Sequence, residues 1–136
     1  FSSWSKDPST QTGCVVVDPE THLILATGYN GLPRGIVDDW RLHDREVKYD
    51  LIIHAEVNAL LHSTQSVKGG DMYVWPWMPC IRCAVLVVQA GIRSVVAPAN
   101  NSPRWASDFE KTQNLFDEAG VVLTVVKLES VSSAGD

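Results

Sequence analysis

The sequence predicts an α/β domain with a largely parallel or mixed sheet, because strand patterns and helix patterns alternate along it. Short β-branched apolar runs indicate the strands, apolar residues at helical spacing indicate the helices, and Gly, Pro and Asp mark the boundaries. The chain has 136 residues, of which 45% are hydrophobic and 20% charged, so it is long enough for one core of its own. We find no internal repeat, and we expect a single domain over residues 1–129 followed by a disordered tail at residues 130–136.

The first two strands are expected to form a hairpin. Residues 14–17 are a β-branched apolar run that ends at the turn signal Asp18-Pro19, and residues 23–28 are its partner. Residues 29–49 are rich in Gly, Pro, Asp and Arg. A connection of that length in a compact domain is usually functional or mobile.

The next two elements carry or precede the polar clusters of the chain. Apolar residues recur at helical spacing over residues 50–63, which predicts a helix with His54 and Glu56 in its first turns. Residues 72–74 are expected to be a strand, and they lead into the tryptophan-rich segment Trp75-Pro76-Trp77-Met78-Pro79.

Two further helices and two further strands complete the chain. Helices are expected at residues 80–90 and 106–119, because each apolar pattern is followed by a glycine. The remaining strands are expected at residues 93–97 and 121–128.

Charge and cysteine content exclude some classes of protein. A net charge of −5 with scattered basic residues argues against a long nucleic-acid partner, which would require a basic surface. No apolar run approaches the length of a membrane span, and we find no N-terminal signal pattern. Two of the three cysteines form a Cys-x-x-Cys pair, which predicts metal binding in a reducing compartment, and hence a cytoplasmic protein.

Two short clusters contain the candidate chemistry, His54-Ala55-Glu56 and Pro79-Cys80-Ile81-Arg82-Cys83. An imidazole and two closely spaced thiolates suit zinc, and three protein ligands leave one coordination position for water. The alternatives are a redox Cys-x-x-Cys pair and a structural zinc site, which would need a fourth ligand. The candidates for a fourth ligand are Cys14, which we expect to be a buried small hydrophobe, His43, and His62, two helical turns beyond His54.

Glu56 decides between these alternatives. Zinc lowers the pKa of its bound water, and a neighbouring carboxylate can take the proton and return it to a ring nitrogen and a leaving amine. The alternative for Glu56 is an ordinary exposed helix glutamate. Together with the three ligands, Glu56 predicts a hydrolytic deaminase, and the pattern His-x-Glu…Pro-Cys-x-x-Cys is the signature of zinc-dependent base deaminases.

The sequence resembles the cytidine/deoxycytidylate deaminase superfamily, and within it the deoxycytidylate (dCMP) deaminase branch, over roughly residues 5–125. The matching segments are Ser5 to Gly13, Gly28 to Gly35, Lys48-Tyr49, His54 to Ala59 and Gln89 to Ile92. The resemblance implies a cytidine-deaminase-like three-layer fold, with a five-stranded mixed sheet flanked by helices. It also implies a homo-oligomer, a dimer or a hexamer.

The resemblance further implies roles for single residues. In relatives, the asparagine at the position of Asn30 contacts the substrate sugar, and the backbone at Ala55 faces the pyrimidine carbonyl. The residues implied in binding a dCTP or dTTP effector at a subunit interface are Gly28, Tyr29, Gly31 and Arg34.

Other candidate ligand residues come from their chemistry. Cations and a hydroxyl could hold a phosphate, and the candidates are Ser5, Lys6 and Arg34. Trp75 and Trp77 could stack on a base or pack in the core.

The predicted function is zinc-dependent conversion of a small cytosine nucleotide, dCMP first, to dUMP with release of ammonia. The alternatives are the same chemistry on cytidine, a modified cytosine, guanine or a riboflavin-pathway pyrimidine. A tRNA adenosine deaminase is disfavoured by the acidic charge, and a non-catalytic zinc module by the presence of Glu56.

Overall fold

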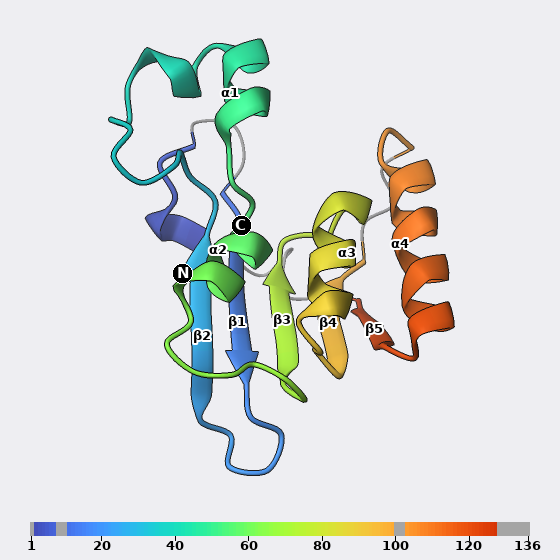
Figure 1. Ribbon diagram of the computed structural model, residues 1–136. Coiled ribbons are helices and arrows are strands. Elements are labelled where there is room, and N and C mark those ends of the chain that lie inside the picture. Colours follow the sequence, from blue (N-terminus) through green and yellow to red (C-terminus); the bar gives the residue numbers. More distant parts are fainter. Residues whose placement is uncertain (1, 8–10, 100–102, 128–136) are drawn as a thin grey trace.

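A five-stranded mixed sheet forms the centre of the molecule (Figure 1). The computed structural model describes residues 2–7, 11–99 and 103–127. The strands are β1 (Gly13–Val17), β2 (Ile24–Tyr29), β3 (Asp71–Trp75), β4 (Ser94–Pro98) and β5 (Val122–Val126). Their order is β2-β1-β3-β4-β5, with β1 antiparallel to both neighbours and β3, β4 and β5 parallel. The predicted mixed sheet is confirmed.

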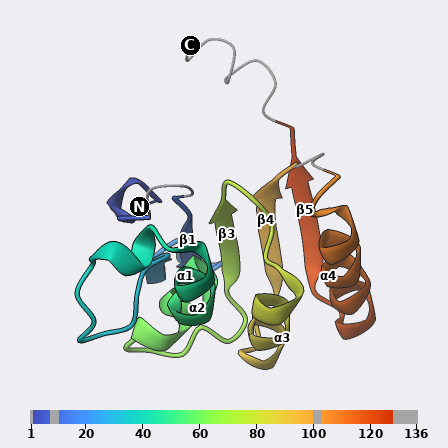
Figure 2. The same cartoon turned by 90° about the horizontal axis from the view of Figure 1, so that it is seen from above.

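The described helices are α1 (Arg45–Leu51), α2 (Ala55–His62), α3 (Ile81–Gln89) and α4 (Ala106–Ala119), with short 3-10 helices at Ser2–Trp4 and Trp40–Leu42. Figure 2 shows α2, α3 and α4 on the same side of the strands, so the described residues contribute two of the three expected layers. The predicted tail at residues 130–136 lies outside the described residues. No helix in the described part is both long and apolar enough to cross a membrane.

The core lies between the sheet and the helix layer. Every second residue of β1 and β3 points into it, and Val16 and Met72 are fully buried there. Helices α3 and α4 close the core with Val87 and Phe116, which are fully buried as well. Cys14 packs in the same core as a small hydrophobe, as the sequence predicted.

Helix α2 packs directly on the backbone of β2, because Gly28 has no side chain. A Cβ atom at Gly28 would lie 2.4 Å from the backbone nitrogen of Ala59 and 2.6 Å from the carbonyl oxygen of Ala55. Glycine therefore sets the distance between the sheet and the helix that follows His54.

The single helix predicted at residues 50–63 is wrong, because two helices with an extended break replace it. Helix α1 begins inside residues 29–49, which were predicted to be a long connection, and there the Asp44 side chain accepts a hydrogen bond from the backbone N–H of Val47. The break at Ile52–His54 is extended because the backbone of Ile53 exchanges two hydrogen bonds with Gly31. His54 is consequently the N-cap residue of α2 and not part of a helical turn.

Candidate active site

Two neighbouring helix N-termini bring the three candidate ligands together. His54 is the N-cap residue of α2, Cys80 is the N-cap residue of α3, and Cys83 lies in the first turn of α3. The His54 Nδ1 atom lies 3.1 Å from the Cys83 sulfur and 3.4 Å from the Cys80 sulfur. The His54 side chain makes no cap hydrogen bond to its own helix, so its imidazole can serve as a ligand.

This donor set fits a zinc ion. The three ligand atoms lie within 4.8 Å of one another, and they are the imidazole and thiol groups that zinc prefers. Among the described residues they form the only such group, so neither His43, His62 nor Cys14 joins them. Three protein ligands leave a fourth coordination position for water or substrate, as in catalytic sites.

A hydrogen bond between the two thiols shifts their pKa values in opposite directions. The Cys83 thiol donates to the Cys80 sulfur, which lowers the pKa of Cys80 to about 4, and the same bond raises the pKa of Cys83. The hydrogen bond to Cys80 also raises the pKa of His54. Metal binding to such a group requires the thiolates and the neutral imidazole, so it releases protons.

Glu56 lies in the first turn of α2 and is buried, with 5% of its surface exposed. Burial raises the pKa of Glu56 from its ordinary value of 4.5 to about 7, and the charge on Cys80 adds to the shift. Glu56 lines the same cavity as His54 and Cys80. A carboxyl group with this pKa can both accept and donate a proton near neutral pH.

Helix α4 holds the segment that carries Cys80. The Asp108 carboxylate accepts a hydrogen bond from the Ile81 backbone N–H at 3.2 Å, and the Thr112 hydroxyl donates to the Pro79 carbonyl at 2.9 Å. No local sequence pattern marks Asp108 or Thr112 for these roles, because each contacts a residue about 30 positions away in the chain. The bond from Thr112 is buried, and it fixes the backbone just before the cysteine.

A cavity of about 540 Å³ is lined by His54 and Cys80, two of the three candidate ligands, and is within the size range of small-molecule sites. Trp77 and Asn30 line it, together with Arg45 and Arg104. The Arg45 guanidinium lies 5.3 Å from the centre of the Tyr49 ring, and that of Arg104 lies 5.0 Å from the Trp105 ring. The cavity therefore combines a buried acid, aromatic side chains and exposed cations.

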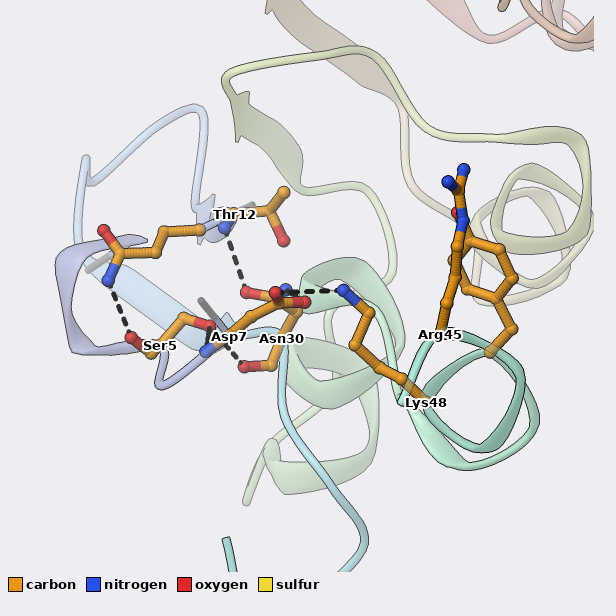
Figure 3. Close-up of polar contacts among 8 residues, drawn as sticks. Ser5, Asp7, Thr12, Asn30, Arg45 and Lys48 are labelled. Atoms are coloured by element: carbon orange, nitrogen blue, oxygen red, sulfur yellow. Dashed lines mark hydrogen bonds and ion pairs between the residues drawn. The ribbon is translucent and has the colours of Figure 1, made fainter. Parts of the chain in front are cut away.

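Asn30 is held in one orientation within this cavity (Figure 3). Its Oδ1 atom accepts from the Thr12 backbone N–H at 3.0 Å, and its Nδ2 atom donates to Asp7 Oδ2 at 3.3 Å. The Ser5 hydroxyl donates to the backbone carbonyl oxygen of Asn30 at 2.9 Å. Ser5 is thus buried under Asn30 and does not itself line the cavity.

Of the other substrate candidates, Ala55, Trp75 and Lys6 do not line the cavity. Ala55 is fully buried at the start of α2. Trp75 is 50% exposed and lines a shallow groove on the sheet with Tyr73 and Val96, whereas Trp77 alone of the two tryptophans lines the cavity. Lys6 is exposed and lines a second groove.

The second groove is lined by all four residues for which the resemblance implied a role in effector binding. Gly28, Tyr29, Gly31 and Arg34 all line it. Asn30 and Asp7 line both the second groove and the cavity, so the two spaces adjoin.

The mixed sheet with a His-Cys-Cys group at two helix N-termini and a buried glutamate defines a zinc-dependent deaminase. The family described as "Cytidine and deoxycytidylate deaminase zinc-binding region" matches residues 2–99. The chain belongs to this family. The predicted resemblance, the zinc cofactor and the hydrolytic class of enzyme are confirmed.

Sequence similarity to known proteins extends over most of the chain. An uncharacterized deaminase of Aliivibrio fischeri is 38% identical over 130 residues, which are 93% of this chain and 86% of that protein. The deoxycytidylate deaminase of Homo sapiens is 40% identical over 126 residues, covering 86% of this chain and 68% of the human protein.

Solved structures share the fold. The dCMP deaminase of the cyanophage S-TIM5 in apo form has a TM-score of 0.71 at 24% identity, over 93% of this chain and 88% of that one. The same phage protein in complex with dCMP and dUMP has a TM-score of 0.64 at 25% identity, over 91% and 85%.

Proposed function

We propose that this chain converts dCMP to dUMP and ammonia. The buried Glu56 beside the group formed by His54, Cys80 and Cys83 carries the proposal, because it supplies a proton shuttle next to three zinc ligands. The identity to human deoxycytidylate deaminase and the fold shared with a phage enzyme that binds dCMP and dUMP support this substrate.

Each residue then has a defined part in the reaction. Zinc held by His54, Cys80 and Cys83 supplies a water molecule of lowered pKa when it is bound. Glu56 takes one proton from the attacking water and delivers it to the pyrimidine ring nitrogen, and it then transfers the proton of the newly added hydroxyl group to the leaving amine, which departs as ammonia. The pKa of Glu56, raised to about 7 by burial, suits both directions of transfer.

Three residues orient the substrate in this proposal. The Asn30 amide contacts the sugar, the backbone at Ala55 faces the pyrimidine carbonyl, and the Trp77 ring stacks on the base. The support is that Asn30 and Trp77 line the cavity, and that Ala55 lies between the proposed ligand His54 and Glu56.

The cations of the cavity favour a nucleotide over a nucleoside. Arg45 and Arg104 are exposed residues on its lining, and each guanidinium lies close to an aromatic ring. Arginine binds phosphate through several parallel donors, so these two side chains are suited to the phosphate of dCMP.

Regulation is proposed for the second groove. The groove lined by Gly28, Tyr29, Gly31 and Arg34 would take dCTP or dTTP, and the nearby Lys6 would add a second cation. Because this groove shares Asn30 with the cavity, an occupant could alter substrate binding.

We also propose a homo-oligomer, a dimer or a hexamer, and a cytoplasmic location, where thiol ligands stay reduced.

An ammonia-release screen of the zinc-loaded protein tests the substrate. It would compare dCMP, deoxycytidine, CMP, cytosine, adenine compounds and guanine compounds. We expect dCMP to be turned over fastest, and we expect Arg104→Met to impair dCMP more than deoxycytidine. If dCMP is inert while a nucleoside or base reacts, the nucleotide assignment fails.

Adding dCTP or dTTP to the same assay tests the effector proposal, which predicts a changed rate for wild type and a smaller change for Arg34→Met.

A further inference from the structure

Helix α1 is attached to the rest of the protein in an unusual way. Its buried residue is a lysine, Lys48, with 8% of its surface exposed. The other helices bury apolar side chains such as Ala59, Val87 and Phe116. Figure 1 shows α1 beyond the end of the sheet, and α1 nevertheless supplies Arg45 and Lys48 to the cavity wall.

A buried ion pair makes this attachment. The Lys48 Nζ atom lies 3.1 Å from Asp7 Oδ1, and the two side chains are only 10% and 4% exposed (Figure 3). Asp7 precedes β1 and is 41 residues away in the sequence. Removing one partner of such a pair would leave a buried charge, which is far more costly than losing an exposed pair.

The same carboxylate also holds Asn30. While Oδ1 of Asp7 contacts Lys48, Oδ2 accepts from the Asn30 amide at 3.3 Å. The Thr12 N–H fixes the opposite end of that amide, and the Ser5 hydroxyl accepts from the Asp7 backbone N–H at 3.2 Å. In the described part of the chain, no buried side-chain nitrogen or oxygen lacks a partner.

We infer that Asp7 and Lys48 are positioning residues that assemble the sugar and phosphate half of the active site. Asp7 joins α1, with its Arg45, to Asn30, so one ion pair sets the relative placement of two parts of the substrate site. This inference rests on the proposed function. The residues proposed for the chemical step are anchored separately. His54, Glu56 and the two cysteines lie at α2 and α3, and these helices pack on the apolar core.

The ion pair should therefore govern substrate binding and leave the chemical step largely intact. Losing the hydrogen bonds of a charged group costs enough free energy to change an affinity by about tenfold or more. A purely structural role would instead lower stability and leave the KM of the folded enzyme unchanged.

Three variants of the zinc-loaded full chain separate these possibilities. Lys48→Met removes the tie to α1, and the double variant Asp7→Asn with Lys48→Met removes both buried charges while keeping an oxygen for Asn30. The control is Arg93→Met, which breaks an ion pair of similar length, 2.9 Å to Asp71, that lines neither the cavity nor the second groove. Steady-state kinetics with dCMP, zinc content and urea unfolding would be measured for each.

We expect Lys48→Met to raise the KM for dCMP about tenfold or more, with kcat changed by no more than about threefold and zinc content unchanged. The double variant should be more stable to urea than Lys48→Met but should keep the raised KM. Arg93→Met should leave the KM unchanged. A wild-type KM in Lys48→Met, or a KM in the double variant that returns together with stability, would overturn the inference.

Amide hydrogen exchange tests the attachment of α1 without any substrate. Lys48→Met should speed exchange over residues 45–51 and leave α3 unaffected, whereas Arg93→Met should leave residues 45–51 protected. Unchanged exchange in Lys48→Met would overturn the inference. A wild-type protein that fails to deaminate dCMP would overturn the proposed function instead, and the exchange result would still decide whether the ion pair anchors α1.

Discussion

At the scale of single residues, the chemistry depends most on Glu56, because this buried acid lines the cavity together with His54 and Cys80, two of the proposed ligands. We predict that Glu56→Gln lowers the rate of ammonia release at least about 100-fold, since the proton transfer is lost. Zinc should remain bound, because its proposed ligands are untouched. Metal analysis and the ammonia assay check both points, with the exposed Glu46→Gln as a control. Full activity of Glu56→Gln would remove Glu56 from the mechanism.

The raised pKa of Glu56 also predicts a pH effect on stability in zinc-free protein. A carboxyl group with a pKa of about 7 when folded and 4.5 when unfolded binds more protons in the folded state. The folded state therefore loses stability as the pH rises from about 4.5 to about 7. Urea unfolding at about pH 5 and about pH 8 should show that Glu56→Gln becomes more stable relative to wild type at the higher pH. A difference that does not change with pH would contradict this assignment.

The role of a residue could be predicted from the sequence where it depends on the spacing of neighbouring residues. It could not be predicted where it depends on contacts between distant parts of the chain. His54, Glu56, Cys80 and Cys83 stand in two short clusters, so their type and spacing sufficed to group them. The partner of Lys48 could not be identified, because it lies 41 residues away.

The two tryptophans could have been separated by strand periodicity. Met72 and Val74 point into the core, so Tyr73 and Trp75, which alternate with them, belong on the opposite face of β3. Trp77 lies beyond the end of β3 and escapes this alternation.

At the scale of elements, the contact between β2 and α2 decides where His54 and Glu56 lie. We predict that Gly28→Ala strongly lowers both stability and zinc affinity, because its Cβ would lie 2.4 Å from the backbone of Ala59. Backbone atoms cannot rotate away, so α2 as a whole must shift. Gly31→Ala is the matched control, since a Cβ there meets nothing within 4 Å. Thermal unfolding and competition with a zinc chelator measure the effects, and equal behaviour of the two variants would contradict the prediction.

Helix α4 should act on the metal through the backbone of Pro79. We predict that Thr112→Val weakens zinc binding about 10-fold or more, because second-layer hydrogen bonds orient metal ligands. Thr112→Ser keeps the hydroxyl and should retain most of the affinity. Titration with a chromophoric chelator gives the affinities, and unaltered binding in Thr112→Val would show that the Pro79 contact has no influence on the site.

Local signals predicted elements well where neighbouring residues determine them. The helix expected at residues 106–119 is observed over the same residues, since Gly120 ends it in the left-handed conformation at φ 82°. The helix expected at residues 50–63 was divided because Ile53 pairs with Gly31, a contact between distant segments that overrides helical spacing.

At the scale of the whole molecule, alternation of strands and helices sufficed to predict an α/β domain with a largely parallel or mixed sheet. What the pattern could not show is which faces of the sheet are covered. The described helices that pack on the sheet, α2, α3 and α4, share one face (Figure 2). The opposite face presents an apolar surface, which we call the open face, formed by Val15, Tyr73, Trp75, Val96 and Val126.

The open face provides the test of the proposed homo-oligomer. Tyr73 and Trp75 are 47% and 50% exposed, and contiguous apolar surface of this kind commonly marks an interface. We predict that wild type is a dimer or larger assembly by light scattering, and that Trp75→Lys reduces its mass because a charge would be buried in the contact. Val85→Lys, at an exposed apolar position on α3, should leave the assembly unchanged. Zinc content must stay at one ion per chain in both variants, so that a lower mass is not the result of unfolding. A wild-type protein that stays monomeric, or an assembly that tolerates Trp75→Lys, would mean that copies of this chain do not meet through the open face.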